Sequence, residues 1–176
     1  MKTLIEHAQE LDEAARMSSL HVFDIDDTLF HTHAKIHVLD PMGRSVQTLS
    51  NAEFNDHSLP RGHSYDFHEF RSADKFSRTS QPILRMLNKL KAIHHHIIKV
   101  PNSRVIMNTA RADFDDRDKF LATFRRHGVP IDKIHVHRAG NIPGNDLPAV
   151  KKNQVLKPYL DKHSYGSVHM YDDSRT

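Results

Sequence analysis

The sequence contains no cysteine. This absence excludes disulfide bonds, thiolate metal sites and nucleophilic cysteine chemistry, and it fits a protein of the cytoplasm. The sequence also lacks an apolar run long enough to cross a membrane. Its opening stretch, MKTLIEHAQELDEAARM, is too polar for a signal peptide. We therefore expect a cytoplasmic protein that does not contact the membrane.

Composition indicates a globular protein with a mild excess of positive charge. The 176 residues are 38% hydrophobic and 27% charged, which is typical of one soluble domain spanning residues 1–176. The net charge of +3 and the pI of about 9.2 permit nucleic-acid binding without requiring it. Unperturbed histidine titrates near ~6.5, so with 16 histidines we expect the positive charge to rise as the pH falls below neutrality.

Hydrophobic patterns predict strands that alternate with helices. Short apolar runs predict strands at 20–26, 104–110, 132–138 and 167–173. Helical periodicity and end signals predict helices at 80–98, 112–128 and 149–163, the last interrupted by Pro158. Another amphipathic helix is expected at the start of the chain, where one face would carry Leu4, Ala8, Leu11 and Ala15.

The segment after the first strand has a different pattern. Alternating runs around a Pro-Met-Gly turn predict a hairpin at 34–49, and residues 51–80 are expected to form short helices and loops. We therefore expect an α/β fold: a three-layer, Rossmann-like, mostly parallel sheet with a short β-hairpin flap and small lid insert, approximately residues 31–80, after strand 1. The sequence stops three residues after Asp173, where such a domain usually continues. We expect a truncated C-terminal end or a missing layer supplied from elsewhere.

Polar residues lie at the carboxyl ends of three of the predicted strands: in the segment Asp24 to Thr28, at Asn108 and Thr109, and at Asp172 and Asp173. In open α/β sheets, ligands bind beyond the carboxyl ends of the strands. An acidic strand end can also be a turn with a cap for the next element. A calcium loop is excluded because its sixth position would be Leu29 instead of Gly and its twelfth Lys35 instead of Glu.

Carboxylates gathered at one sheet edge repel each other unless a cation lies among them. Mg²⁺ is the cation that proteins usually bind with few carboxylates plus substrate phosphate. Once the charge is neutralised, a phosphate group can approach and a carboxylate can attack phosphorus. This chemistry predicts a magnesium-dependent phosphoryl-transfer site.

The motifs resemble those of the haloacid dehalogenase-like (HAD) phosphohydrolase superfamily. The stretch DIDDT, from Asp24 to Thr28, is similar to the first motif of the family, and VIMNTAR supplies Thr109 for the second. A lysine near the start of the helix expected at 149–163 corresponds to the third motif, and HMYDD supplies the final acidic pair. The order of the motifs is also similar to that of the phosphatase domains of polynucleotide end-repair enzymes.

The resemblance implies roles for the residues of the first two motifs. It implies that Asp24 is the nucleophile and that Asp26 is the general acid and base. It implies that Thr28 steadies the loop beside the substrate, and that Thr109 hydrogen-bonds the transferring phosphoryl group. Asp27 has no family role, and we interpret it as a local cap.

The resemblance also implies a Mg²⁺ cofactor. Its ligands would be Asp24 and Asp26, the latter through its backbone carbonyl, together with Asp172 and Asp173. Lys151 and Lys152 both match the lysine of the family, and spacing favours Lys152. For Arg111, two interpretations stay open: contact with substrate phosphate, or pairing with acids of the next helix.

Histidines are candidates of lower rank. The run at 94–96 is expected to be a solvated surface, because consecutive helical residues point in different directions. His135 and His137 share one face of a predicted strand, near the mouth of the expected site. His31 and His33 follow the first motif, where a lid would bring them over the substrate.

These observations predict a Mg²⁺-dependent phosphomonoester hydrolase that acts through an aspartyl-phosphate. About eighty residues separate Thr28 from Thr109, which leaves no room for a large cap domain. An open site would admit a nucleotide or a nucleic-acid terminal phosphate; a small-metabolite phosphatase is the alternative substrate class. A phospho-acceptor or binding module without turnover is the alternative function, although receiver domains of that class lack D-x-D-x-T. The sequence does not indicate an oligomeric state.

Overall fold

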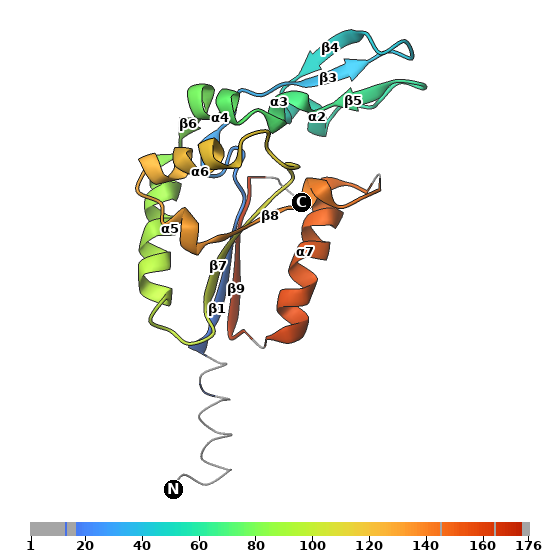
Figure 1. The fold of residues 1–176 in the computed structure, drawn as a ribbon. Coiled ribbons are helices and arrows are strands. Elements are labelled where there is room, and N and C mark those ends of the chain that lie inside the picture. Colours follow the sequence, from blue (N-terminus) through green and yellow to red (C-terminus); the bar gives the residue numbers. More distant parts are fainter. Residues whose placement is uncertain (1–12, 14–16, 145, 164, 174–176) are drawn as a thin grey trace, which may run out of the picture.

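A central sheet of four parallel strands forms the body of the protein (Figure 1). The structure is a computed structural model that describes residue 13 and residues 17–144, 146–163 and 165–173. The strand order is β8-β7-β1-β9, and the strands are β1 (Ser19–Phe23), β7 (Arg104–Thr109), β8 (His135–Arg138) and β9 (Ser167–Tyr171). The predicted α/β class with a mostly parallel sheet is confirmed, and it is compatible with a Rossmann-like fold. The helix predicted at the start of the chain lies outside the described residues.

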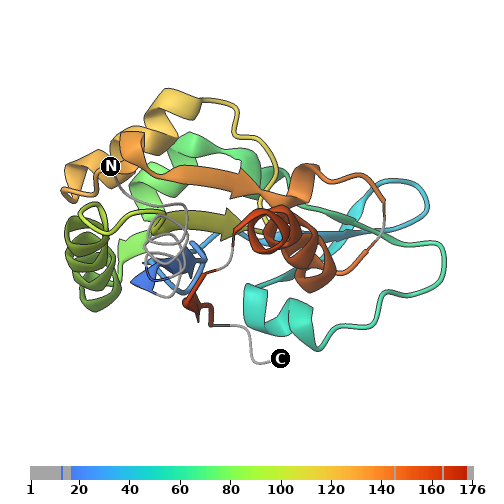
Figure 2. The same ribbon diagram turned by 90° about the horizontal axis from the view of Figure 1, so that it is seen from below.

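Helices cover both faces of this sheet. Figure 2 shows α5 (Leu84–Ile97) and α6 (Arg117–Arg126) on one side and α7 (Pro148–Lys162) on the other. Because side chains alternate along a strand, Phe23 and Met107 pack toward α5 and α6, whereas Val22 and Ile106 pack toward α7. None of the helices in the described ranges is long and apolar enough to cross a membrane.

The helices differ in extent from the prediction, and α5 begins at Leu84 instead of residue 80. α6 begins at Arg117, because the side chain of Asp116 accepts a hydrogen bond from the Lys119 amide (2.9 Å) and so caps the helix there. α7 runs through Pro158 without a break, contrary to the predicted interruption. Pro158 is exposed, so water can reach the backbone carbonyl that lacks its usual helical partner.

The expected solvated surface at 94–96 is wrong for one of its three histidines. His94 is buried on α5, while His95 and His96 are exposed. Burial, followed by nearby Lys133 and His95, lowers the pKa of His94. Because each residue of a helix points in a different direction, one imidazole of the run is buried while its two neighbours face solvent.

The segment between β1 and α5 forms a small antiparallel sheet with short helices. We name residues 31–80 the insert. Its sheet has the order β4-β3-β5, with β3 (Ile36–Leu39), β4 (Ser45–Leu49) and β5 (Ser64–Asp66), and its helices are α2 (Asn51–Asn55), α3 (His68–Arg71) and α4 (Ala73–Thr79). A two-stranded pair of β2 (Phe30–His31) and β6 (Gln81–Pro82) lies at its base. The strand β5 was not predicted, since three residues are too few to show a period.

The insert has its own apolar core. Ile36, Val38, Leu49 and Phe70 are buried together, with Tyr65 packed against them. Figure 1 shows the insert beyond the carboxyl ends of the parallel strands, which is the edge where polar residues were predicted to gather. The fold therefore places the insert over the candidate site.

Candidate active site

Asp24 is the first residue after β1 and lies at the carboxyl end of the sheet. Its amide donates a hydrogen bond to the carbonyl of Tyr171 (2.9 Å), which joins the end of β1 to the end of β9. The next residues turn sharply: the amides of Leu29 and Phe30 both donate to the carbonyl of Ile25. This turn directs the acidic stretch to the mouth of the sheet instead of into its interior.

Lys152 lies between two of the predicted acids. Its Nζ atom is 2.9 Å from Oδ2 of Asp24 and 2.8 Å from Oδ2 of Asp172. The side chain of Asn108, at the end of β7, donates to the Lys152 carbonyl (2.9 Å) and so fixes the first turns of α7. Lys151 points elsewhere, because its ammonium donates to the carbonyls of Ile142 and Gly144. The structure therefore places Lys152, and not Lys151, in the acidic cluster.

The cluster is short of positive charge. The pKa of Asp24 is raised to about 7, and burial is the largest cause. Lys152 opposes this rise, whereas the negative charges of Asp26 and Asp172 add to it. Burial lowers the pKa of Lys152, but the adjacent Asp24 and Asp172 outweigh burial and hold it above its ordinary value. One ammonium thus faces several carboxylates, and the site favours an additional cation.

Oxygen atoms of three acids are positioned to share a cation. One carboxylate oxygen from each of Asp24, Asp172 and Asp173 lies within 4.8 Å of the others. The Oδ1 atom of Asp24 is buried and has no hydrogen-bond partner in the described part of the chain. Burial and the neighbouring acids Asp27 and Asp172 also raise the pKa of Asp173. An all-oxygen donor set with an unsatisfied buried oxygen fits Mg²⁺.

Asp26 is held by Arg111. The Nε atom of Arg111 lies 2.9 Å from Oδ2 of Asp26, and its Nη2 lies 2.6 Å from Oδ1. This buried guanidinium also contacts the insert: Nη1 donates to the Phe70 carbonyl (2.7 Å), and Nη2 donates to the Thr32 hydroxyl (2.9 Å). Pairing of Arg111 with acids of the next helix, one of the two predicted possibilities, is wrong: its acidic partner is Asp26.

The two threonines of the motifs are both buried. Thr109 is fully buried at the end of β7, and its Oγ1 accepts a hydrogen bond from the Arg111 amide (3.2 Å). The Oγ1 atom of Thr28 has no hydrogen-bond partner among the residues described. Thr109 thus lies beside Arg111, whereas any role of Thr28 in steadying the loop does not come from a hydrogen bond of its hydroxyl to the described residues.

Asp27 makes contacts with the insert instead of serving as a local cap. It adopts a left-handed backbone conformation (φ +54°), which aspartate tolerates better than most residues. Its Oδ2 accepts a hydrogen bond from the side chain of Asn51 (2.9 Å), and its Oδ1 lies 3.5 Å from Nδ1 of His31. Asp27 therefore connects the turn after β1 to α2.

One histidine of lower rank also contacts α7. His137 lies beside Asn108 in the register of β7 and β8, and its Nε2 contacts the Tyr159 hydroxyl (2.7 Å). Asn108, Thr32 and the Phe70 carbonyl are site components that sequence reasoning did not assign. The position of Asn108 beside Thr109 at a strand end could have indicated it. Nothing in the sequence indicated Thr32 or the carbonyl of Phe70.

Comparisons with models of known protein families, with curated proteins and with solved structures found no match.

Proposed function

We propose that this protein is a Mg²⁺-dependent phosphomonoesterase of the HAD-like type that forms an aspartyl-phosphate on Asp24. The observation that carries this proposal is the buried Asp24 carboxylate, which contacts Lys152 with one oxygen and has no hydrogen-bond partner in the described chain for the other. A carboxylate at a rigid strand end, beside an ammonium and two further acids, is suited to nucleophilic attack on phosphorus. The resemblance of DIDDT and YDD to the family motifs supports the same assignment.

The residues present fit a magnesium ion. Asp24, Asp172 and Asp173, with the backbone carbonyl of Asp26, would hold it. When bound, Mg²⁺ supplies the positive charge that lets an anionic phosphate approach a group of carboxylates.

The proposed reaction has two steps. In the first, an Asp24 oxygen bonds to phosphorus while the bond to the leaving oxygen breaks, and Asp26 gives that oxygen a proton. In the second, water bonds to phosphorus, its proton goes to Asp26, and the bond to Asp24 breaks to release inorganic phosphate. Lys152 and the Thr109 end of β7 would stabilise charge on the transferring group.

Asp26 must change its contacts for this reaction. Both of its oxygens accept hydrogen bonds from Arg111 in the structure, so one oxygen has to turn toward the substrate. Contact of Arg111 and Thr28 with the substrate stays a prediction. The same ion pair favours the second candidate function, a phospho-acceptor or binding module without turnover, because such a module does not need proton transfer by Asp26.

We propose a nucleotide or a nucleic-acid terminal phosphate as the substrate, with a small-metabolite phosphomonoester as the alternative. The insert spans about 50 residues, which is small for a cap domain, and the net charge is +3. A polymer would contact basic residues around the mouth, so its binding should weaken with salt, with a log–log slope of about −0.7 per phosphate for single strands. A mononucleotide should respond much less.

Phosphate release from a substrate panel tests these proposals. The panel contains p-nitrophenyl phosphate, mononucleotides, sugar phosphates and 3′-phosphorylated oligonucleotides, each assayed with Mg²⁺ or with EDTA. Release of many phosphates per protein, only with Mg²⁺, is the expected result. Release of one leaving group per protein, with the phosphoryl group retained on the protein, would favour the acceptor module, and full activity in EDTA would contradict the metal requirement. If phosphate release from the oligonucleotide is no faster than from its mononucleotide at low salt, a small substrate is the better interpretation.

A further inference from the structure

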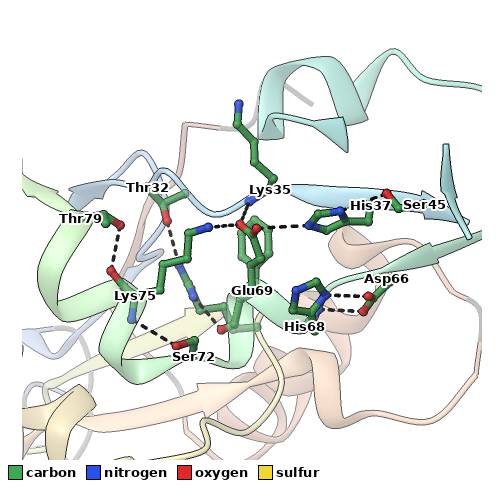
Figure 3. Close-up of polar contacts among 12 residues, drawn as sticks. Thr32, Lys35, His37, Ser45, Asp66, His68, Glu69, Ser72, Lys75 and Thr79 are labelled. Carbon is green, nitrogen blue, oxygen red and sulfur yellow. Dashed lines mark hydrogen bonds and ion pairs between the residues drawn. The ribbon is translucent and has the colours of Figure 1, made fainter. Parts of the chain in front are cut away.

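A second group of potential metal ligands lies within the insert (Figure 3). His37 comes from β3, and His68 and Glu69 come from the start of α3. One ligand atom from each of the three lies within 4.8 Å of the others, and Nε2 of His37 is 3.2 Å from Oε1 of Glu69. The imidazole rings of His37 and His68 are stacked, with centroids 4.8 Å apart. Two imidazoles and a carboxylate form a set that proteins use for zinc.

Each of these side chains has its other polar atom held by a second residue. Nδ1 of His37 lies 3.2 Å from the Ser45 hydroxyl, and Nδ1 of His68 lies 2.6 Å from Oδ2 of Asp66 (Figure 3). Oε2 of Glu69 accepts hydrogen bonds from the Lys35 amide (2.6 Å) and the Lys75 ammonium.

This arrangement leaves Nε2 of both histidines and Oε1 of Glu69 for a metal ion. Histidines that bind metals usually donate their other ring N–H to a carboxylate or another oxygen, which fixes the ring and its tautomer. The pair of His68 and Asp66 has this form. Because an ionised carboxylate accepts only, Nδ1 of His68 carries the proton and Nε2 is left as the electron-pair donor.

A network of ion pairs without metal is the ordinary alternative. In that network Glu69 pairs with His37 and Lys75, and His68 pairs with Asp66. These pairs do not by themselves require ligand atoms of His37, His68 and Glu69 to meet within 4.8 Å of one another, whereas a shared metal ion does. His68 is exposed, so solvent can reach the site and fill a fourth ligand position.

We propose that His37, His68 and Glu69 bind one divalent transition-metal ion, with Zn²⁺ as the ion their chemistry suits, and that this ion clasps β3 to α3. The metal site does not depend on the proposed phosphatase activity. It lies one residue from the Phe70 carbonyl, which accepts a hydrogen bond from Arg111, the partner of Asp26. A bound ion would therefore hold the α3 backbone that contacts Arg111.

Titration of the full chain with Zn²⁺ in excess Mg²⁺ tests this site. Mg²⁺ will occupy oxygen ligands at the acidic cluster and does not compete well for imidazole. We expect one calorimetric Zn²⁺ site that is lost in His37→Ala and in His68→Ala. The Asp66→Asn variant should bind about 10–100-fold more weakly, because it loses a partner that orients a ligand.

Matched controls come from histidines outside the cluster. His63→Ala changes a half-buried histidine of the same insert, and His95→Ala changes one of the exposed histidines of the run on α5. Both variants should bind Zn²⁺ as the unmodified protein does. Far-ultraviolet circular dichroism will show that each variant is folded, and Co²⁺ absorption spectra will report nitrogen ligation.

Two results would overturn the site. One is Zn²⁺ binding of equal strength in His37→Ala, His68→Ala and the unmodified protein. The other is the absence of a stoichiometric Zn²⁺ complex in the folded, unmodified protein.

Discussion

The acidic cluster and the histidine cluster differ in the backbone that carries them. Asp24 and Asp172 follow neighbouring parallel strands, and the hydrogen bond from the Asp24 amide to the Tyr171 carbonyl fixes their spacing. His37 and His68 instead lie on a small antiparallel sheet and a four-residue helix. A strand end in a packed sheet suits a reacting group, because the core determines its position. The strands and helices of the insert are short, so a metal ion that holds β3 to α3 would stabilise them.

The two clusters also differ in ligand chemistry and burial. The acidic cluster offers oxygen atoms only, and Asp24 is buried. The histidine cluster offers imidazole nitrogen, and His68 is exposed. Hard oxygen ligands select Mg²⁺, whereas imidazole favours a transition metal. The comparison predicts that changes in one cluster leave the chemistry of the other intact.

The Asp24→Asn variant should show the largest effect. It removes the proposed nucleophile while keeping the shape of the side chain, so multiple-turnover phosphate release should be abolished. Zn²⁺ binding should be unchanged, and thermal unfolding will show whether the variant is folded. Sustained phosphate release by a folded Asp24→Asn protein would remove Asp24 from the role of nucleophile.

The Asp26→Asn variant should slow phosphate release by about 10²–10⁴-fold, because proton transfer in both steps would be lost. Arg111 would also lose the charge of its partner. Steady-state rates with p-nitrophenyl phosphate measure the effect. Rates equal to those of the unmodified protein would mean that another residue transfers the proton.

Lys152→Met and Lys151→Met form a matched pair on one helix. We expect Lys152→Met to lower kcat by about 10²–10³-fold, because an ammonium beside the transferring group is lost. The kcat of Lys151→Met should stay close to that of the unmodified protein, since the Lys151 ammonium contacts backbone carbonyls outside the cluster. Equal losses of activity in the two variants would contradict the assignment of Lys152.

A smaller effect, on stability, should come from His137, whose ring contacts the Tyr159 hydroxyl on α7. Burial, followed by His135 and Arg138, lowers the pKa of His137 from 6.5 to about 4. The folded state therefore binds fewer protons than the unfolded state, so this contribution to stability is complete above about pH 6.5 and is lost as the pH falls toward 4. Urea unfolding across this pH range measures the effect. The free energy of unfolding of His137→Asn should depend less on pH than that of the unmodified protein.

His63→Asn, at a half-buried histidine of the insert, serves as the control, and its unfolding should follow that of the unmodified protein. If His137→Asn and the unmodified protein lose stability in parallel between these pH values, burial of His137 is not the cause.

Contiguous motifs made the acidic cluster predictable. Asp24 and Asp172 each directly follow a short apolar strand, and the rule that parallel strands end at one edge brings them together. Successive residues of a helix point about 100° apart, so Lys151 and Lys152 cannot face the same group. Which of them faces the acidic cluster depends on how α7 packs on the sheet. Spacing favoured Lys152, but the sequence did not show the hydrogen bond from Asn108 to its carbonyl.

Contacts between distant segments could not be predicted. Arg111 has acids close by in the sequence, yet it pairs with Asp26, which is 85 positions away. His37 meets His68 because β3 pairs with β5, where His37 lies opposite Asp66. A strand of three residues gives almost no periodic signal, so neither this pairing nor the histidine cluster was visible in the sequence.

Chemical trapping of the phosphorylated protein tests the central claim most directly. A labelled phosphomonoester is mixed with the Asp26→Asn variant and Mg²⁺, the reaction is quenched in acid, and the modified peptide is located by mass spectrometry. Because Asp26→Asn should slow hydrolysis of the intermediate, we predict a phosphoryl group on Asp24, and none in the Asp24→Asn, Asp26→Asn double variant. A phosphoryl group on another residue, or equal labelling of both variants, would contradict the account.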